Sequence, residues 1–156
     1  FELSDEERAR GTALVRLAAC LQFFFPGSPC IYYGDEAGVE GFEDPFNRTF
    51  YPWNREDTAL REYYRKLGKL KRAHKEMQSG VLRVLFAEGD VIVLSRTHGE
   101  DEVIAAVNRG DSERTVFIRN PHNYVDVITN KSYKSRLGIL LLRIPGRDNC
   151  VLTKMQ

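Results

Sequence analysis

The sequence lacks any long apolar run and any excess of charge of one sign. Its longest apolar stretches, Leu21–Phe25 and Gly138–Leu142, fall far short of the roughly 20 residues that a helix needs to cross a bilayer. The 23 lysines and arginines face 22 aspartates and glutamates, so the formal net charge is only +1. We therefore predict no membrane span and no membrane partner. We also predict no nucleic-acid partner, because nucleic-acid binding leaves a basic footprint.

Paired cysteines, metal-ligand spacings and phosphate-binding glycine loops are also missing. Cys20, Cys30 and Cys150 are odd in number, sit among apolar residues and show no C-x-x-C spacing. This pattern predicts buried free thiols and a reducing, cytoplasmic location. The three histidines have no carboxylate or cysteine at ligand spacing, and Gly38 and Gly41 lack the following Lys-Ser/Thr of a phosphate loop. We expect no metal and no cofactor.

The chain is long enough, at 156 residues, for one ordinary domain or two small ones. It opens Phe-Glu-Leu-Ser-Asp-Glu-Glu, without an initiator Met and without the basic and apolar regions of a signal peptide. We interpret it as a piece of a longer protein.

The first half combines two helical patterns with one short apolar run. Ser4 and Glu7 have capping-box spacing, and apolar residues then recur at helical steps up to Phe25, where Pro26-Gly27 should end a helix. Residues 29–33, which are aromatic and β-branched, are typical of a buried strand. Residues 34–53 contain three glycines and two prolines without a sustained period, which favours a long functional loop. Residues 54–77 again follow helical spacing, with a charged opposite face.

After Gly80 the pattern changes to short β-rich runs separated by turn residues. Glycine-centred turns at 88–90, 98–100 and 109–111 predict hairpins between neighbouring strands. This spacing is typical of an antiparallel β-sandwich with a core of its own. We place a domain boundary near Ser79-Gly80, between residues 1–79 and 80–156. The predicted strands span residues 81–86, 91–96, 103–108, 115–118, 124–128, 139–144 and 150–152.

Three segments of the first half resemble one enzyme family. A single strand followed by a loop and a helix is the repeating unit of a (β/α) barrel, whose sites lie in the loops after the strands. Residues 26–36 (PGSPCIYYGDE), 44–48 (DPFNR) and 52–53 (PW) resemble the eighth barrel strand and its loop in the α-amylase superfamily of glycoside hydrolases. They are most similar to the neopullulanase, cyclomaltodextrinase and maltogenic amylase branch.

The resemblance covers essentially the whole chain, since the helix and sandwich that follow have the order and lengths of that family. It implies an α+β fragment: the last β/α unit or units of a (β/α)8 TIM barrel in residues 1–79, then an antiparallel β-sandwich C-terminal domain in residues 80–156. It also implies hydrolysis of α-glucosidic bonds in oligosaccharides, cyclodextrins or pullulan by a retaining mechanism. The partner of the parent enzyme would be an α-glucan oligosaccharide or a cyclodextrin.

The three catalytic acids of the resembled family lie on barrel strands that would precede Phe1. We therefore expect no catalytic residue in this chain and no activity from it alone. Asp35 and Glu36 cannot replace them, because neighbours on a strand point to opposite faces, whereas retaining chemistry needs two carboxyl groups about 5 Å apart. We predict that one of them supports the side chains that contact the substrate. Capping of nearby backbone N–H groups is an equal alternative.

Asp44 and Arg48 are the predicted substrate-binding residues. A carboxylate accepts hydrogen bonds from vicinal hydroxyls and an arginine fork donates to them. The glycone-side subsites of the resembled family include residues at these motif positions. A spacing of four in a turn also allows the two side chains to pair with each other and hold the loop, and both roles are compatible.

Aromatic residues are dense in the same loop and can stack on glucose rings or pack in the barrel. We predict that Trp53 packs in the core, as a staple of the following helix. Tyr32 and Tyr33, as strand neighbours, should point in opposite directions.

Two further expectations concern the chain as a whole. An unpaired strand and an exposed apolar helix stripe predict self-association. The alternative function is a non-catalytic β-sandwich module that binds carbohydrate or a partner protein. Against it, the aromatics Phe86, Phe117, Tyr124 and Tyr133 lie mostly inside strands instead of forming an exposed row.

Overall fold

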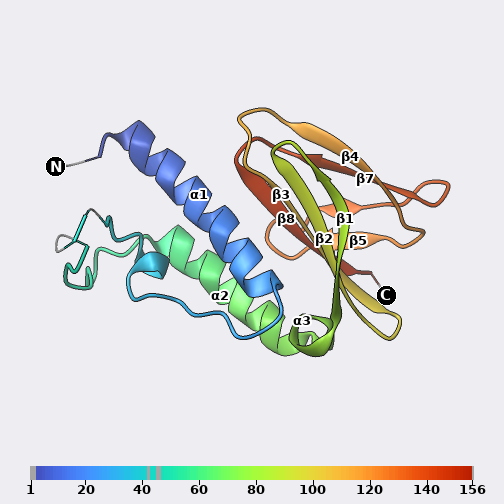
Figure 1. Cartoon of the computed structure of the whole chain (residues 1–156), viewed down its shortest axis with the longest axis horizontal. Coiled ribbons are helices and arrows are strands. Elements are labelled where there is room, and N and C mark those ends of the chain that lie inside the picture. Colours follow the sequence, from blue (N-terminus) through green and yellow to red (C-terminus); the bar gives the residue numbers. More distant parts are fainter. Residues whose placement is uncertain (1–2, 42, 45–46, 156) are drawn as a thin grey trace.

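A computed structural model describes residues 3–41, 43–44 and 47–155, which form a helical layer packed against a β-sandwich (Figure 1). The two long helices, α1 (Asp5–Phe24) and α2 (Thr58–Ala73), lie beside each other and cover one face of the larger sheet. No helix within the described ranges has the length and apolar character needed to cross a membrane.

Helix α1 forms where the capping-box spacing predicts it. The Ser4 hydroxyl accepts a hydrogen bond from the Glu7 N–H at 3.3 Å, and the Glu7 carboxylate accepts one from the Ser4 N–H at 2.9 Å. The helix ends at Phe24, just before Pro26-Gly27. The predicted helix is therefore confirmed. Its buried face consists of Leu17, Ala19, Cys20, Phe23 and Phe24.

Helix α2 begins later than residue 54. Asp57 is its N-cap, and the Asp57 carboxylate accepts a hydrogen bond from the Leu60 N–H at 2.9 Å. Asn54 cannot belong to the helix, because its φ of 62° is left-handed. An extended His74 separates α2 from the short α3 (Lys75–Ser79), so the second predicted helix is two helices.

The strand predicted over residues 29–33 does not form. Tyr32 and Tyr33 are 58% and 46% exposed, and no strand of the described residues lies alongside this segment to share its hydrogen bonds. An extended segment becomes a strand only where a neighbouring strand pairs with it. The Gln22 side-chain amide, which donates to the Cys30 carbonyl at 2.6 Å, holds this segment against α1.

All three cysteines are free, but they are not all buried. Cys20 and Cys150 lie in the core, whereas Cys30 is exposed. The prediction of burial is wrong for Cys30 because it belongs to the segment that does not pair as a strand.

The second half forms two antiparallel sheets, as predicted. A sheet of two strands faces a sheet of six, and the core of the sandwich lies between them. The larger sheet has the order β1 (Val81–Glu88), β2 (Val91–His98), β3 (Asp101–Asn108), β8 (Asp148–Lys154), β5 (Tyr124–Asp126) and β6 (Ser132–Tyr133), and the smaller one contains β4 (Arg114–Arg119) and β7 (Ile139–Ile144).

Two of the three predicted hairpins are present. The turns at 88–90 and 98–100 join β1 to β2 and β2 to β3. The turn at 109–111 instead carries the chain from the larger sheet to the smaller one, since β4 pairs only with β7. This crossing is tight: a Cβ atom at Gly146 would lie 2.2 Å from the Asp111 carbonyl oxygen.

Two apolar clusters stabilise the fold. One fills the space between the two sheets. The other is shared by α1 and α2 with the outer face of β2, β3 and β8. Tyr63 adds a polar link to the second cluster, because its hydroxyl donates to the Arg16 carbonyl at 3.1 Å and accepts from the Asn149 amide at 2.8 Å. The change from helix to strand falls at Gly80, and the division into two domains there stays a prediction.

Candidate functional site

The candidate site is the long loop between α1 and α2. A short 3-10 helix, η1 (Asp35–Ala37), opens it, and the Asp57 N–H donates to the Ala37 carbonyl at 2.9 Å, so the two ends of residues 38–56 meet. Gly34 permits the entry turn: its φ is 96°, and a Cβ atom there would lie 2.8 Å from Val39 Cγ2. The loop projects at the end of the molecule opposite the β-sandwich (Figure 1).

Several contacts tie the loop to the rest of the helical layer. The Tyr33 hydroxyl donates to the Thr49 carbonyl at 3.1 Å. Arg8 of α1 forms an ion pair with Glu40. These contacts hold the loop along the N-terminal half of α1 and the segment that follows that helix.

Asp44 and Arg48 form an ion pair on the surface of this loop. Arg48 Nε lies 2.9 Å from Asp44 Oδ1, and the two side chains are 69% and 62% exposed. The pairing that the spacing allowed is therefore present. None of the described residues hydrogen-bonds to the other polar atoms of the two side chains. They remain accessible to a ligand that carries hydroxyl groups.

Asp35 and Glu36 lie in η1 and not at a strand end, because the preceding segment is not a strand. The Glu36 carboxylate accepts a hydrogen bond from the Gly34 N–H at 3.1 Å, which is the backbone-capping alternative. Among the described residues, no hydrogen bond or ion pair joins either acid to Asp44 or Arg48. Support of the substrate-binding side chains by these two acids stays a prediction.

Unlike the exposed Asp44–Arg48 ion pair, the acids of η1 lie in a partly buried environment. Partial burial raises the pKa of the Asp35 carboxyl, and the nearby Glu36 charge adds to this effect. Burial also raises the pKa of Tyr64 to about 12, with smaller contributions from Asp35 and Glu36. These effects arise because η1 packs against α2. Asp35 and Tyr64 line a small pocket of about 330 Å³ against α1.

Exposed aromatic side chains flank the ion pair along the chain. Trp53 is 75% exposed and its ring centroid lies 4.6 Å from that of Tyr51, so the prediction that it packs in the core is wrong. The late start of α2 at Thr58 leaves Trp53 too far from the helix to act as its staple. Phe50 is 97% exposed. Phe42 and Phe46 lie outside the described residues.

Tyr32 and Tyr33 lie side by side and do not point in opposite directions. Their ring centroids are 4.8 Å apart at an interplanar angle of 41°. The segment turns at these residues, since the Asp35 N–H donates to the Tyr32 carbonyl at 3.2 Å. The alternation of a strand does not apply there.

A metal centre has no support in the described part of the chain. None of its histidine, cysteine, aspartate and glutamate side chains gather in groups of three or more that could hold an ion. The site offers instead an exposed carboxylate, an exposed guanidinium and exposed aromatic rings.

The chain has relatives among known proteins. No protein-family profile matches the sequence. An amylopullulanase of Thermoanaerobacter thermohydrosulfuricus is 34% identical over 169 residues, covering 97% of this chain and 12% of that protein. A cyclomaltodextrinase of Thermoanaerobacter pseudethanolicus is 30% identical over 133 residues, covering 84% of this chain and 23% of that protein. The chain thus spans only a small part of the relatives it matches.

A solved structure shows the same fold. The α-amylase of Geobacillus thermoleovorans, in complex with acarbose, superposes with a TM-score of 0.84 at 21% identity, covering 93% of this chain and 34% of that one. The helices and antiparallel sheets described above therefore match a portion of an α-amylase structure. Over nearly its whole length the chain is homologous to the C-terminal region of α-amylase family enzymes.

Proposed function

We propose that this chain is the part of an α-glucan hydrolase that supplies glucose-binding residues and a stabilising β-sandwich, without the catalytic carboxylates. The observation that carries the proposal is the exposed Asp44–Arg48 ion pair on the same loop as the exposed rings of Phe50 and Trp53. The names of the relatives, amylopullulanase and cyclomaltodextrinase, support an α-glucan oligosaccharide or a cyclodextrin as the substrate.

The chemistry of the ion pair suits a neutral polyol. The carboxylate of Asp44 accepts hydrogen bonds from sugar hydroxyls, and the guanidinium of Arg48 donates to the oxygens of the same ring. Because the two side chains already hold each other, less side-chain entropy is lost when the sugar binds. The Trp53 ring offers an apolar face for the C–H side of a glucose unit.

Cleavage of the glycosidic bond requires groups that we do not assign to this chain. The Glu36 carboxylate accepts a hydrogen bond from the Gly34 backbone N–H, and the Asp44 carboxylate is paired with Arg48. A retaining glycosidase needs two carboxyl groups about 5 Å apart across the scissile bond. We infer that the isolated 156-residue chain binds glucan without hydrolysing it.

The binding test is an NMR titration of the labelled chain with maltotriose. Shift changes should fall in the loop between Ala37 and Asp57, and Asp44→Ala or Arg48→Ala should each weaken binding about tenfold, because each removes a hydrogen bond to a charged group. Arg55→Ala is the matched control, since it removes an exposed charge from the same loop. Binding that is unchanged in both variants contradicts the proposal. Shift changes confined to the β-sandwich would favour the alternative, a sugar-binding sandwich module.

The activity test uses the same preparation with pullulan and with β-cyclodextrin. No release of reducing sugar is expected. Release at a rate above that of a heated sample would show that the chain contains a complete catalytic site and would contradict the inferred division of labour.

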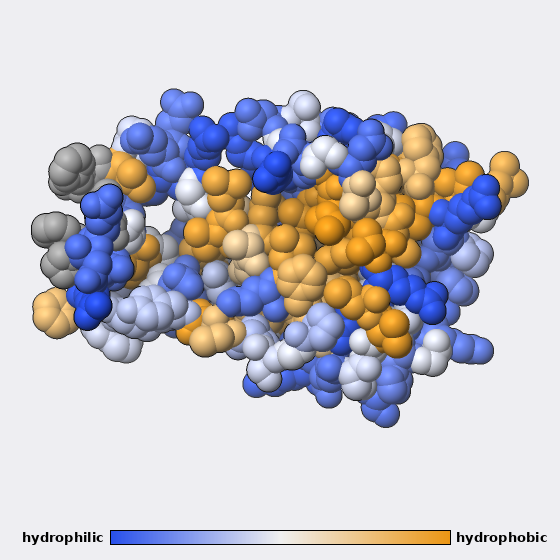
Figure 2. All heavy atoms as spheres, viewed as in Figure 1, coloured by the Kyte–Doolittle hydropathy of each residue, from blue (hydrophilic) through white to orange (hydrophobic). Residues whose placement is uncertain are grey.

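We also propose that the chain associates with itself through its exposed apolar surface. Leu14 and Val15 of α1 are 42% and 37% exposed, and an apolar groove of about 550 Å³ runs between α1 and the β1–β2 hairpin. Edge strand β1 exposes Val81 and Val84 as well. Figure 2 shows hydrophobic residues gathered over the strands at the middle and right of this face.

Light scattering coupled to size exclusion tests the association. A mass above 17.9 kDa that rises with concentration is expected, and Leu14→Glu should return it to the monomer value. A constant monomer mass at high concentration would overturn this proposal and leave the glucan-binding proposal untouched.

A further inference from the structure

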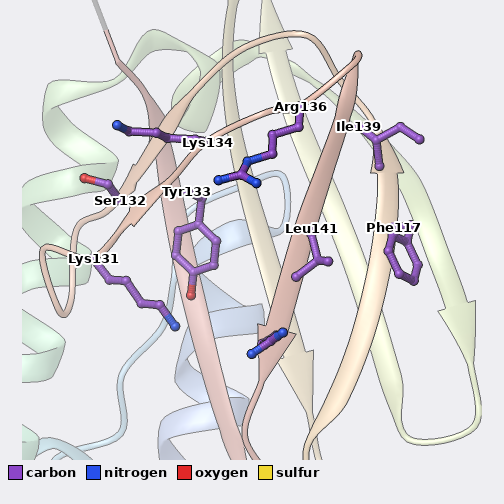
Figure 3. A pocket seen from close by; sticks show the side chains of 9 residues that line it. Phe117, Lys131, Ser132, Tyr133, Lys134, Arg136, Ile139 and Leu141 are labelled. Carbon is purple, nitrogen blue, oxygen red and sulfur yellow. The ribbon is translucent and has the colours of Figure 1, made fainter.

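A pocket of about 620 Å³ lies on the outer surface of the β-sandwich, formed by β4, β6, β7 and the segment between β6 and β7. Figure 3 shows Lys131, Tyr133 and Arg136 on one side of it and Leu141, Ile139 and Phe117 on the other. It shares no lining residue with the loop between α1 and α2. The remaining lining residues are Ser132, Lys134 and Arg143.

The floor of the pocket is apolar although it faces solvent. Phe117 and Leu141 lie directly opposite each other in the β4–β7 pairing, and Ile139 is two residues along the same face. The alternate residues of both strands point into the sandwich core, so this face is not needed to bury the core. Phe117 is 66% exposed. The two strands thus display a flat apolar platform.

The walls of the pocket carry cations and no acid. Lys131, Lys134, Arg136 and Arg143 line it, and no aspartate or glutamate does. Within the described ranges none of these four side chains forms an ion pair. The Lys131 ammonium lies 5.2 Å from the centroid of the Tyr133 ring. The chain as a whole balances 23 cations against 22 acids, so this concentration is local.

An ordinary solvent-exposed surface does not explain why an apolar platform and a cluster of cations occur together. Surface charges of an ordinary domain are mixed in sign, and exposed apolar residues are scattered singly. Here four cationic side chains surround an apolar platform, with no acid among the lining residues. The volume of the pocket is within the range of small-molecule sites, about 300–1,000 Å³. Both halves of the arrangement are explained by one ligand that has an anionic group and a ring with an apolar face.

We propose that this pocket binds a phosphorylated sugar. Arg136 and Arg143 can donate paired hydrogen bonds to phosphate oxygens, a geometry that the guanidinium fork suits, while the lysines add positive charge. The C–H face of the sugar ring packs on Phe117 and Leu141. This inference is independent of the glucan-binding loop, because the two sites have no residue in common.

Isothermal titration of the 156-residue chain with three probes tests the proposal: glucose 6-phosphate, inorganic phosphate and maltose. Glucose 6-phosphate should bind most tightly, phosphate more weakly, and maltose should not displace either from the pocket. Arg136→Gln and Arg143→Gln should each weaken glucose 6-phosphate binding about tenfold. Phe117→Ala should weaken glucose 6-phosphate binding severalfold and leave phosphate binding unchanged.

Arg114→Gln is the matched control, because Arg114 is an exposed arginine of β4, the strand that carries Phe117, and lies outside the pocket. It should bind all probes as the unaltered chain does. Equal affinity for phosphate and glucose 6-phosphate, with no effect of Phe117→Ala, would overturn the sugar part of the proposal. Displacement of glucose 6-phosphate from the pocket by maltose at equal concentration would overturn the anionic part. Binding of heparin without binding of either small anion would overturn both parts in favour of a polyanionic partner.

Discussion

Arg96 joins the helical layer to the β-sandwich through backbone carbonyl groups. Its side chain is fully buried on β2, with Nη1 donating to the Phe24 carbonyl at 2.8 Å and Nε donating to the Gly80 carbonyl at 3.0 Å. Lys71 donates to the neighbouring Phe23 carbonyl at 3.0 Å. Two cations thus satisfy carbonyls at the C-terminal end of α1, where the helix dipole favours positive charge.

Replacing Arg96 with methionine should lower the free energy of unfolding by about 3 kcal/mol, because two buried carbonyls lose charged donors. Urea denaturation followed by circular dichroism measures the change. Arg83→Met on β1, where the arginine is exposed, should change it by less than about 0.5 kcal/mol. An effect of Arg96→Met as small as the one expected for Arg83→Met would mean that the buried hydrogen bonds contribute no stability.

The three cysteine thiols are expected to differ in reactivity. Cys30 is exposed, whereas burial raises the pKa of the Cys20 thiol to about 12 and raises the pKa of Cys150 as well. Only Cys30 should react with Ellman's reagent at pH 8 in the native chain, since thiolate exposure controls the rate. All three should react in 6 M guanidinium. Labelling of more than one thiol in the native chain would contradict the prediction that only Cys30 is reactive. Labelling that persists in Cys30→Ser would contradict it as well.

At the scale of elements, two glycines differ in whether the structure has room for a side chain at their positions. A Cβ atom at Gly80 would lie 2.4 Å from the Glu76 carbonyl oxygen and 2.7 Å from that of Thr97, so the backbones of α3 and β2 meet there. Gly11 lies in the middle of α1, and a Cβ atom there would have no neighbour within 4 Å. Close approach requires the first glycine, and no contact requires the second.

Gly80→Ala should therefore destabilise the chain by about 1–3 kcal/mol through overpacking against backbone. Gly11→Ala should stabilise it by up to about 1 kcal/mol through helix propensity. Thermal melts of the two variants, compared with the unaltered chain, should shift in opposite directions. A melting temperature that does not fall in Gly80→Ala would show that the backbones of α3 and β2 can separate without cost.

Local patterns predicted the elements that local interactions stabilise. The capping box of Ser4 and Glu7 and the turns at 88–90 and 98–100 are contained in a few residues, and each is present. Residues 29–33 have the composition of a strand, but a strand depends on a partner that composition cannot provide. The turn at 109–111 has hairpin residues, yet the choice between sheets is made by packing between distant segments.

The Asp44–Arg48 loop and the basic pocket also differ in how far local sequence predicts them. Asp44 and Arg48 are four residues apart, so their ion pair could be foreseen from spacing, whereas the exposure of Trp53 depends on where α2 starts. The basic pocket draws its residues from β4 and from positions 131–143, which only the pairing of β4 with β7 brings together. Residues 131–143 contain the four cations together with Ile139 and Leu141, whereas Phe117 comes from β4.

For the whole molecule, the shared core decides whether the helices and the sandwich unfold together. Apolar residues of α1 and α2 are buried against β2, β3 and β8 in one cluster. Tyr63 crosses this boundary, linked to the Arg16 carbonyl on α1 and to Asn149 on β8. Burial raises the pKa of its hydroxyl far above the ordinary value, so it stays protonated and can donate throughout the working pH range.

We therefore expect one cooperative unfolding transition for the described helices and sheets. Native-state hydrogen exchange should give the same unfolding free energy for slowly exchanging amides of α1 and of β3. Tyr63→Phe should lower both values together by about 1–2 kcal/mol, because it removes a buried hydroxyl that donates to α1 and accepts from Asn149 of β8. Tyr51→Phe, which changes a tyrosine of the projecting loop, should lower neither. If Tyr63→Phe lowered the value for α1 alone, the helical layer would open as a separate unit, and the shared cluster would not couple it to the sandwich.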